Sequence, residues 1–165
     1  MKILNHHEII DRITRIAVEI EERNLNEEKV FIAGINNNGW TLANLIFQEL
    51  KQRDSNVQYE LFKIKINPAA PLDDKLHFDI DTEKLKDQNL IIIDDVANTG
   101  RTLFYAFGPL MNVLLKRVDI AVLVDRKHKT FPIQVDYMGI SLATTLLENI
   151  RVYFDEGNYS AILIQ

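Results

Sequence analysis

The sequence contains no cysteine and, among its 165 residues, only four prolines and six glycines. The lack of cysteine excludes disulfide bonds and zinc sites built from thiolates, and it is compatible with a reducing compartment. No apolar run approaches the length of a membrane span, and the first eight residues lack the long apolar core of a signal peptide. We therefore expect a cytoplasmic protein without a membrane partner.

An excess of positive charge is also missing. The net charge is −5 and the sequence pI is about 5.4, so the chain has no general attraction to nucleic acids or anionic lipids. The composition is 47% hydrophobic and 26% charged, which is typical of a globular protein. We found no internal repeat, and the length predicts a single domain over residues 1–165 with a substantial core.

The most informative stretch of the chain runs from Leu90 to Thr102. Its first four residues are apolar and predict a strand buried on both faces of a sheet. Asp94 and Asp95 follow directly, and because adjacent carboxylates have no place in a core, we expect them at a solvated rim. Open α/β sheets bind ligands at this carboxyl edge.

The residues after the acidic pair favour an anion. Gly100 lets the backbone approach a ligand closely, Thr99 and Thr102 offer hydroxyl donors, and free N–H groups would open a helix expected over residues 103–116. The nearby carboxylates suit sugar hydroxyls and a hydrated divalent cation. The stretch predicts a sugar-phosphate site with Mg²⁺, although a helix cap beside two surface acids is the simpler structural alternative.

Periodicity predicts the other elements. A capping box at Asn5 and Glu8 opens an amphipathic helix over about the first twenty residues. Residues 30–35 predict a buried strand, Asn36 to Gly39 a turn, and residues 40–50 a helix. This order suits an anion loop, and a purely structural turn is equally compatible with it.

The remaining segments are mostly extended or irregular. We expect a strand at 57–66 whose alternation slips between Leu61 and Phe62, which indicates either a bulge or a strand that gives way to an irregular arm. A proline-rich loop at 67–75 is either a lid or a surface loop. The other expected segments are a polar connection at 81–88, a strand at 118–124, a charged loop at 125–129, extended segments at 132–139 and 150–154, a turn at 155–158 and a last strand at 161–164.

Residues 90–102 resemble the phosphoribosyl-pyrophosphate (PRPP) motif of type I phosphoribosyltransferases. The likeness covers nearly the whole chain. It is closest to the bifunctional pyrimidine-operon attenuation regulators with uracil phosphoribosyltransferase activity, through residues 14–17, 123–126 and 132–139. The resemblance implies an α/β type I fold with a central parallel sheet flanked by helices. It also implies a homodimer and a small hood formed by parts of 62–80 and the C-terminal segment.

The resemblance further implies an enzyme of nucleotide salvage. Such a phosphoribosyltransferase moves ribose 5-phosphate from PRPP to a nucleobase, here a uracil-like pyrimidine, and releases pyrophosphate. Asp94 and Asp95 would hold the ribose hydroxyls directly or through Mg²⁺. The other implied contacts are Val96, Ala97, Asn98, Thr99, Gly100, Arg101 and Thr102 for PRPP and its 5′-phosphate, Asn36, Asn37, Asn38 and Gly39 for pyrophosphate, and Asp125, Arg126, Gln134, Val135, Asp136 and Tyr137 for the base.

The sequence departs from these relatives at several positions. Asn38 stands where they usually carry an arginine, and a neutral donor binds an anion less strongly than a charged one. The segment after Ile66 also lacks much of their lid. A PRPP- or nucleotide-binding regulator with weak or no catalysis is therefore the alternative function. RNA is not an expected partner, because basic or histidine positions of the relatives are here Val18, Gln134, Ile140 and Leu146, and residues 127–129 are compatible with a solvated loop.

Overall fold

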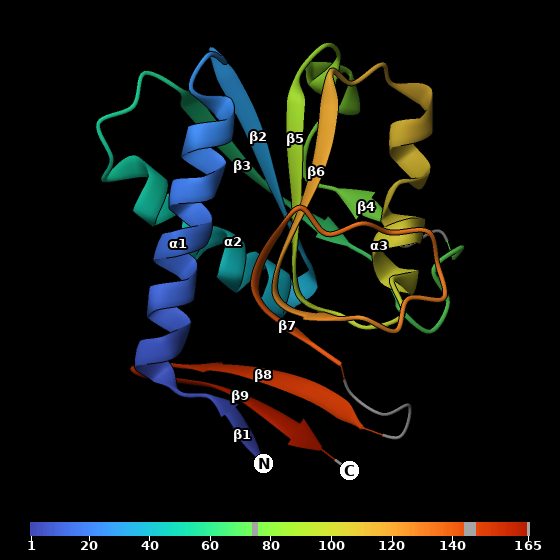
Figure 1. The fold of residues 1–165 in the computed structure, drawn as a ribbon. Coiled ribbons are helices and arrows are strands. Elements are labelled where there is room, and N and C mark those ends of the chain that lie inside the picture. Colours follow the sequence, from blue (N-terminus) through green and yellow to red (C-terminus); the bar gives the residue numbers. More distant parts are fainter. Residues whose placement is uncertain (74–75, 144–147, 165) are drawn as a thin grey trace.

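A computed structural model describes residues 1–73, 76–143 and 148–164. These residues form a six-stranded sheet and a three-stranded sheet, with helices packed around the larger one (Figure 1). The elements in chain order are β1 (Lys2–Leu4), α1 (His6–Asn24), β2 (Lys29–Ile35), α2 (Asn36–Lys51), β3 (Gln58–Lys65), β4 (His77–Phe78), η1 (Thr82–Leu85), β5 (Asn89–Ala97), α3 (Arg101–Ala106), η2 (Gly108–Asn112), β6 (Arg117–Arg126), β7 (Tyr137–Leu142), β8 (Asn149–Asp155) and β9 (Asn158–Ile164), where η marks a 3₁₀ helix.

The large sheet has the order β4-β3-β2-β5-β6-β7. All its neighbouring strands are parallel except β4, which pairs antiparallel with β3 at one edge. The central parallel sheet predicted from the sequence is therefore confirmed. The carboxyl ends of β2, β5 and β6 point toward the small sheet, at the bottom of Figure 1.

Helices cover both faces of the large sheet (Figure 1). The alternation of side chains along β5 explains why four consecutive residues there are apolar. Ile91 and Ile93 pack in the cluster under α1 and α2, whereas Leu90 and Ile92 pack in the cluster that α3, η1 and η2 cover. The predicted capping box at the start of α1 is confirmed. No described helix is long and apolar enough to cross a membrane.

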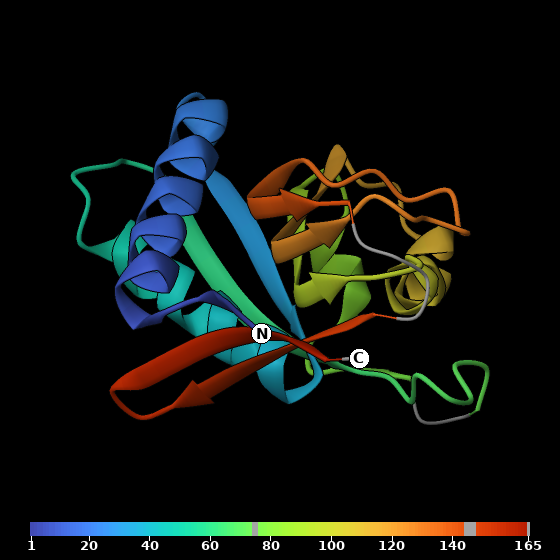
Figure 2. The ribbon, with the colours of Figure 1, turned by 60° about the horizontal axis from the view of Figure 1, so that its bottom comes forward.

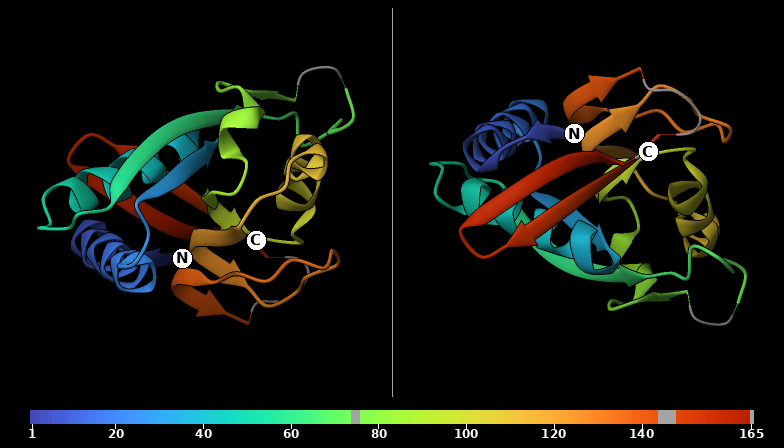
Figure 3. Two further views of the ribbon diagram at one scale, coloured as in Figure 1. Left: turned by 90° about the horizontal axis from the view of Figure 1, so that it is seen from above. Right: turned by 90° about the horizontal axis from the view of Figure 1, so that it is seen from below.

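The small sheet has the order β1-β9-β8 and is antiparallel throughout. It lies across the carboxyl edge of the large sheet, as Figure 2 and the right panel of Figure 3 show. Its buried residues, among them Leu4, Ile150 and Val152, belong to the same cluster as the apolar side of α1. The predicted turn at 155–158 joins β8 to β9, with Gly157 at a φ of 72°. Residues 62–65, which belong to the range expected to contribute to the hood, lie instead in β3 of the large sheet.

Four expectations about local structure are wrong. The helix after Gly100 ends at Ala106, because Pro109 cannot donate the hydrogen bond of a continuing helix, and η2 follows. Strand β3 pairs with β2 in unbroken register, so the expected bulge is absent, and irregular backbone begins only after Lys65. Residues 36–39 are the first turn of α2, and of residues 132–139 only those from Tyr137 on form a strand. Leu146 lies outside the described residues.

Candidate functional site

The acidic pair belongs to the last half of β5. Asp94 and Asp95 are half-buried between β2 and β6 and are less exposed than a rim position would make them. The Asp95 N–H donates to Asp94 Oδ1 at 2.9 Å, and the Val96 N–H donates to Asp95 Oδ1 at 2.9 Å. Loss of water, and then the charge of Asp95, raise the pKa of Asp94 well above its ordinary value. The crowded pair therefore favours a shared proton or cation, and its carboxylate oxygens can also accept hydrogen bonds from hydroxyl groups.

Residues 97–102, which we call the phosphate loop, connect β5 to α3. Gly100 has a φ of 84°, a conformation that favours glycine, and a Cβ there would lie 3.1 Å from Ile133 Cβ. No side chain caps α3, although the Arg101 N–H donates to Thr99 Oγ1 at 3.3 Å. Residues 96–103 and Asp94 enclose a small cavity of about 60 Å³. The backbone of the loop therefore surrounds a space of the size that a compact anion needs.

The first turn of α2 lies beside the acidic pair. Asn38 Nδ2 donates to Asp95 Oδ2 at 2.8 Å and to the Val152 carbonyl at 3.0 Å, so one amide joins β5 to β8. Gly39 is packed so closely that a Cβ would lie 2.7 Å from the Ile93 carbonyl oxygen and 3.3 Å from Asp94 Oδ1. The identity of residue 39 thus decides how near α2 comes to the acids.

The other two asparagines of this turn are also engaged. Asn36 has a φ of 51°, and its Oδ1 accepts a hydrogen bond from the Ile66 N–H at 3.0 Å. Asn37 Oδ1 accepts one from Lys63 Nζ at 2.9 Å. Asparagine tolerates the left-handed conformation better than most residues, which explains its presence at position 36. The turn is therefore fixed to β3 and to the segment that follows it.

A cavity of about 640 Å³ unites these elements. Its lining includes Asp94 and Asp95 of β5, Asn98 and Thr102, Asn36 to Asn38, Pro68, and residues 150–153 of β8. The β8 residues were not predicted from the sequence, and among the described residues that line this cavity Arg151 is the one cationic residue. A strand pattern was visible there, but which cavity a strand borders depends on tertiary packing.

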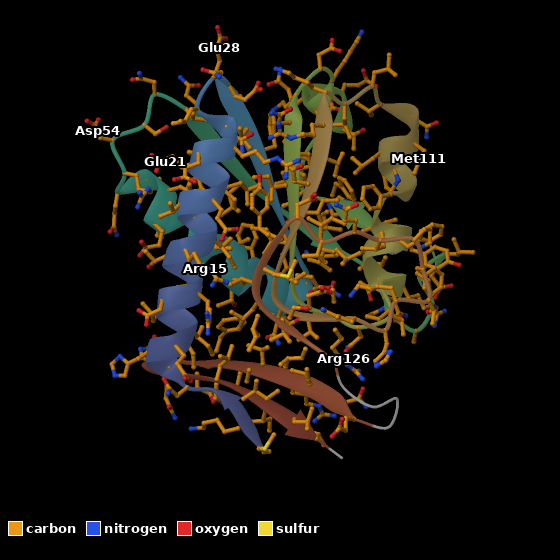
Figure 4. The ribbon with its side chains drawn as sticks, in the orientation of Figure 1. Arg15, Glu21, Glu28, Asp54, Met111 and Arg126 are labelled. Carbon is orange, nitrogen blue, oxygen red and sulfur yellow. The ribbon has the colours of Figure 1, made fainter. Side chains whose placement is uncertain are left out.

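The six expected base contacts fall into two groups. Asp125 and Arg126 end β6, next to the phosphate loop, and Arg126 Nη1 donates to Asn98 Oδ1 at 3.0 Å. Figure 4 shows Arg126 at the end of the large sheet that faces the small sheet. The other four residues, Gln134, Val135, Asp136 and Tyr137, lie farther along the chain, and none of the six lines the cavity that holds the acidic pair.

Three of those four residues have other surroundings. Asp136 Oδ2 accepts a hydrogen bond from the Ile120 N–H at 2.8 Å, and the buried Tyr137 hydroxyl donates to Asp119 Oδ2 at 3.2 Å. Burial, and then the charge of Asp119, raise the pKa of Tyr137. Gln134 lines a separate, largely apolar cavity of about 690 Å³ beside α3.

The acidic pair is also the candidate holder of Mg²⁺. Among the described residues no group of three or more His, Cys, Asp or Glu side chains could hold a metal ion by itself. Mg²⁺ retains several waters and often takes only one or two carboxylates together with substrate oxygens. Asp94 and Asp95 fit that pattern, because a bound sugar phosphate would supply the remaining oxygen ligands.

Comparisons with known proteins agree with this geometry. Residues 1–156 match the model of the phosphoribosyl transferase domain family. Bifunctional protein PyrR from Streptococcus agalactiae serotype Ia is 36% identical over 160 residues, covering 90% of each chain. The protein of the same name from Staphylococcus aureus strain bovine RF122 is 35% identical over 151 residues, covering 87% of this chain and 86% of the relative.

Solved structures share the fold. A hypoxanthine-guanine phosphoribosyltransferase from Bacillus anthracis aligns with a TM-score of 0.72 at 17% identity, over 86% of this chain and 82% of that chain. A hypoxanthine-guanine-xanthine phosphoribosyltransferase aligns with a TM-score of 0.67 at 17% identity, over 86% of this chain and 78% of that chain.

Proposed function

The chain belongs to the phosphoribosyl transferase domain family and has the type I fold, and from this premise we propose that it transfers ribose 5-phosphate from PRPP to a uracil-like pyrimidine. The observation that supports the proposal is the position of Asp94 and Asp95 between the phosphate loop and the first turn of α2, at one cavity. A sugar with a phosphate at each end needs acceptors for its hydroxyls between two anion sites.

Each part of PRPP has a proposed location. The ribose hydroxyls bind Asp94 and Asp95, directly or through Mg²⁺, and the 5′-phosphate binds the backbone and hydroxyls of the phosphate loop. The pyrophosphate faces residues 36–39, and Arg151 on β8 supplies a positive charge to that side of the cavity. We place the base near Asp125 and Arg126 because Arg126 contacts Asn98, which lines the cavity, whereas residues 134–137 do not line it and have no proposed direct contact with the base.

The transfer itself needs position and charge more than covalent catalysis. A ring nitrogen of the base bonds to the sugar carbon C1′ while the C1′–oxygen bond to pyrophosphate breaks, and the electron pair of that bond leaves with pyrophosphate. The ring nitrogen gives up its proton, and the sugar passes through a state with oxocarbenium character. The nearby carboxylates favour the positive charge that develops on the sugar. Mg²⁺, when bound with PRPP, would offset the charge of the leaving group.

Turnover and binding measured side by side test this function. Pyrophosphate release would be followed with uracil, hypoxanthine, guanine, xanthine and adenine, and PRPP binding would be measured by calorimetry with Mg²⁺. We expect turnover with uracil. Binding of PRPP without turnover of any base would contradict the transferase and favour a PRPP-binding regulator. As the family resemblance implies, we also propose a homodimer, which light scattering tests.

A further inference from the structure

The Lys129 side chain reaches back from the segment after β6 to the phosphate loop. Its Nζ donates to the Ala97 carbonyl at 3.2 Å, and also to the Arg126 carbonyl and to Asp125 Oδ1. The side chain is 17% exposed and that of Asp125 is 14% exposed. A lysine ammonium has three N–H donors, and all three have acceptors inside the protein. Lys129 is therefore built into the structure and has no donor left for a substrate.

The residues around Lys129 contact the same loop. The Thr130 and Phe131 N–H groups both donate to the Thr99 carbonyl, at 3.0 and 3.1 Å. Arg126 Nη1 donates to Asn98 Oδ1 at 3.0 Å, and Ile133 packs against Gly100. The phosphate loop thus receives a series of contacts from one segment, residues 126–133.

The loop depends on such support. Its helix α3 is six residues long and has no side-chain cap, so the helix itself does little to fix the loop backbone. Gly100, at a positive φ, adds a residue with wide conformational freedom. The contact from Lys129 to Ala97 falls where β5 ends and the loop begins. Because Asp125 offsets the ammonium charge, Lys129 affects ligand binding through the position of the loop backbone and not through its own charge.

We propose that Lys129 is a positioning residue that holds the phosphate loop in the shape that binds a phosphoryl group. Which phosphoryl compound the loop binds rests on the proposed function, whereas the effect of Lys129 on the loop backbone does not. Without the ammonium, the Ala97 and Arg126 carbonyls lose a donor and Asp125 is left as an unpaired, mostly buried carboxylate. The loop then spends less time in its binding shape, and ligand affinity falls in proportion.

The test compares Lys129→Met with Lys129→Arg and with Lys127→Met. Lys127 is an exposed lysine two residues away, so its substitution removes the same charge without touching the loop. For Lys129→Met we expect a Kd for ribose 5-phosphate and a KM for PRPP that are each raised about tenfold, with kcat changed less than twofold. Amide hydrogen exchange at residues 98–101 of the free protein should be about tenfold faster. Lys129→Arg should restore most of the affinity, and Lys127→Met should match the wild type.

A second variant and a measurement that needs no ligand cover the cases in which Lys129→Met does not fold or the protein does not bind the expected ligands. If Lys129→Met does not fold, the pair Asp125→Asn with Lys129→Met removes both charges and the unpaired carboxylate, and it should still show fast exchange in the loop. Wild-type exchange rates and wild-type ribose 5-phosphate affinity in a folded variant would overturn the proposal. If the wild-type protein binds neither ribose 5-phosphate nor PRPP, the proposed function fails, while the exchange comparison still decides the role of Lys129.

Discussion

Replacing Gly39 with alanine tests whether the packing of α2 on β5 sets the position of the acidic pair. The added Cβ would lie 2.7 Å from the Ile93 carbonyl oxygen, well inside the 3.4 Å of ordinary contact, and 3.3 Å from Asp94 Oδ1. Because the nearest atom is backbone in a central strand, either β5 or α2 has to move. Helix propensity alone predicts the opposite effect, a gain of about 1 kcal/mol for alanine over glycine.

We expect the crowding to dominate. Overpacking of this kind costs about 1–3 kcal/mol, and for a chain of this length each kcal/mol lowers Tm by about 2–4 °C. A displacement of Asp94 approaching 1 Å would lower kcat/KM about 100-fold. Gly108→Ala is the matched control, since among the described residues its Cβ would meet only Leu76 Cδ2, at 3.7 Å. A Gly39→Ala variant with unchanged or raised Tm and wild-type kcat/KM would refute the reasoning.

Four further predictions concern single features. Asp94→Asn with Asp95→Asn should abolish PRPP binding in calorimetry with little change in Tm, and undiminished affinity would exclude their role. Thr99→Val should weaken ribose 5-phosphate binding about tenfold and spare pyrophosphate, because Thr99 lines the small cavity and not the larger one that borders residues 36–38. Arg151→Gln should raise the KM for PRPP about tenfold and Arg151→Lys much less; equal values would remove Arg151 from the site. Burial raises the pKa of Tyr59 to about 12, and ultraviolet titration against Tyr59→Phe checks this value. The neutral hydroxyl therefore favours the folded state fully below about pH 10, and this contribution to the free energy of unfolding is lost as pH rises through 12.

The sequence was most informative where chemistry and secondary structure coincide locally. The apolar run before Asp94 predicted the buried strand, and Gly100 predicted the turn from that strand into α3, because these features depend on neighbours in the chain. Pro109 was a local signal too, and the apolar periodicity across it led to a helix that is too long. The family resemblance correctly implied the fold as a whole.

Features that depend on tertiary packing were not predictable in this way. Lys129 lies in a charged run that usually indicates a solvated loop, and Lys127 and His128 are indeed exposed, but Lys129 packs into the structure. Arg151 belongs to a strand whose alternation was visible, yet nothing local says that this strand borders the acidic pair. The hydrogen bond from Tyr137 to Asp119 likewise follows from the way β7 lies beside β6.

The two hydrogen bonds of the Asn38 amide couple ligand binding at Asp95 to the attachment of β8. One NH₂ group serves both the Asp95 carboxylate and the β8 backbone at Val152, so a ligand that draws Asp95 toward itself changes the tether of the small sheet. If ligand binding weakens the contact of Asn38 with β8 by some factor, thermodynamic reciprocity requires that breaking this contact changes ligand affinity by the same factor. Substitutions in the hairpin of β8 and β9 would then change ligand affinity without contacting the ligand.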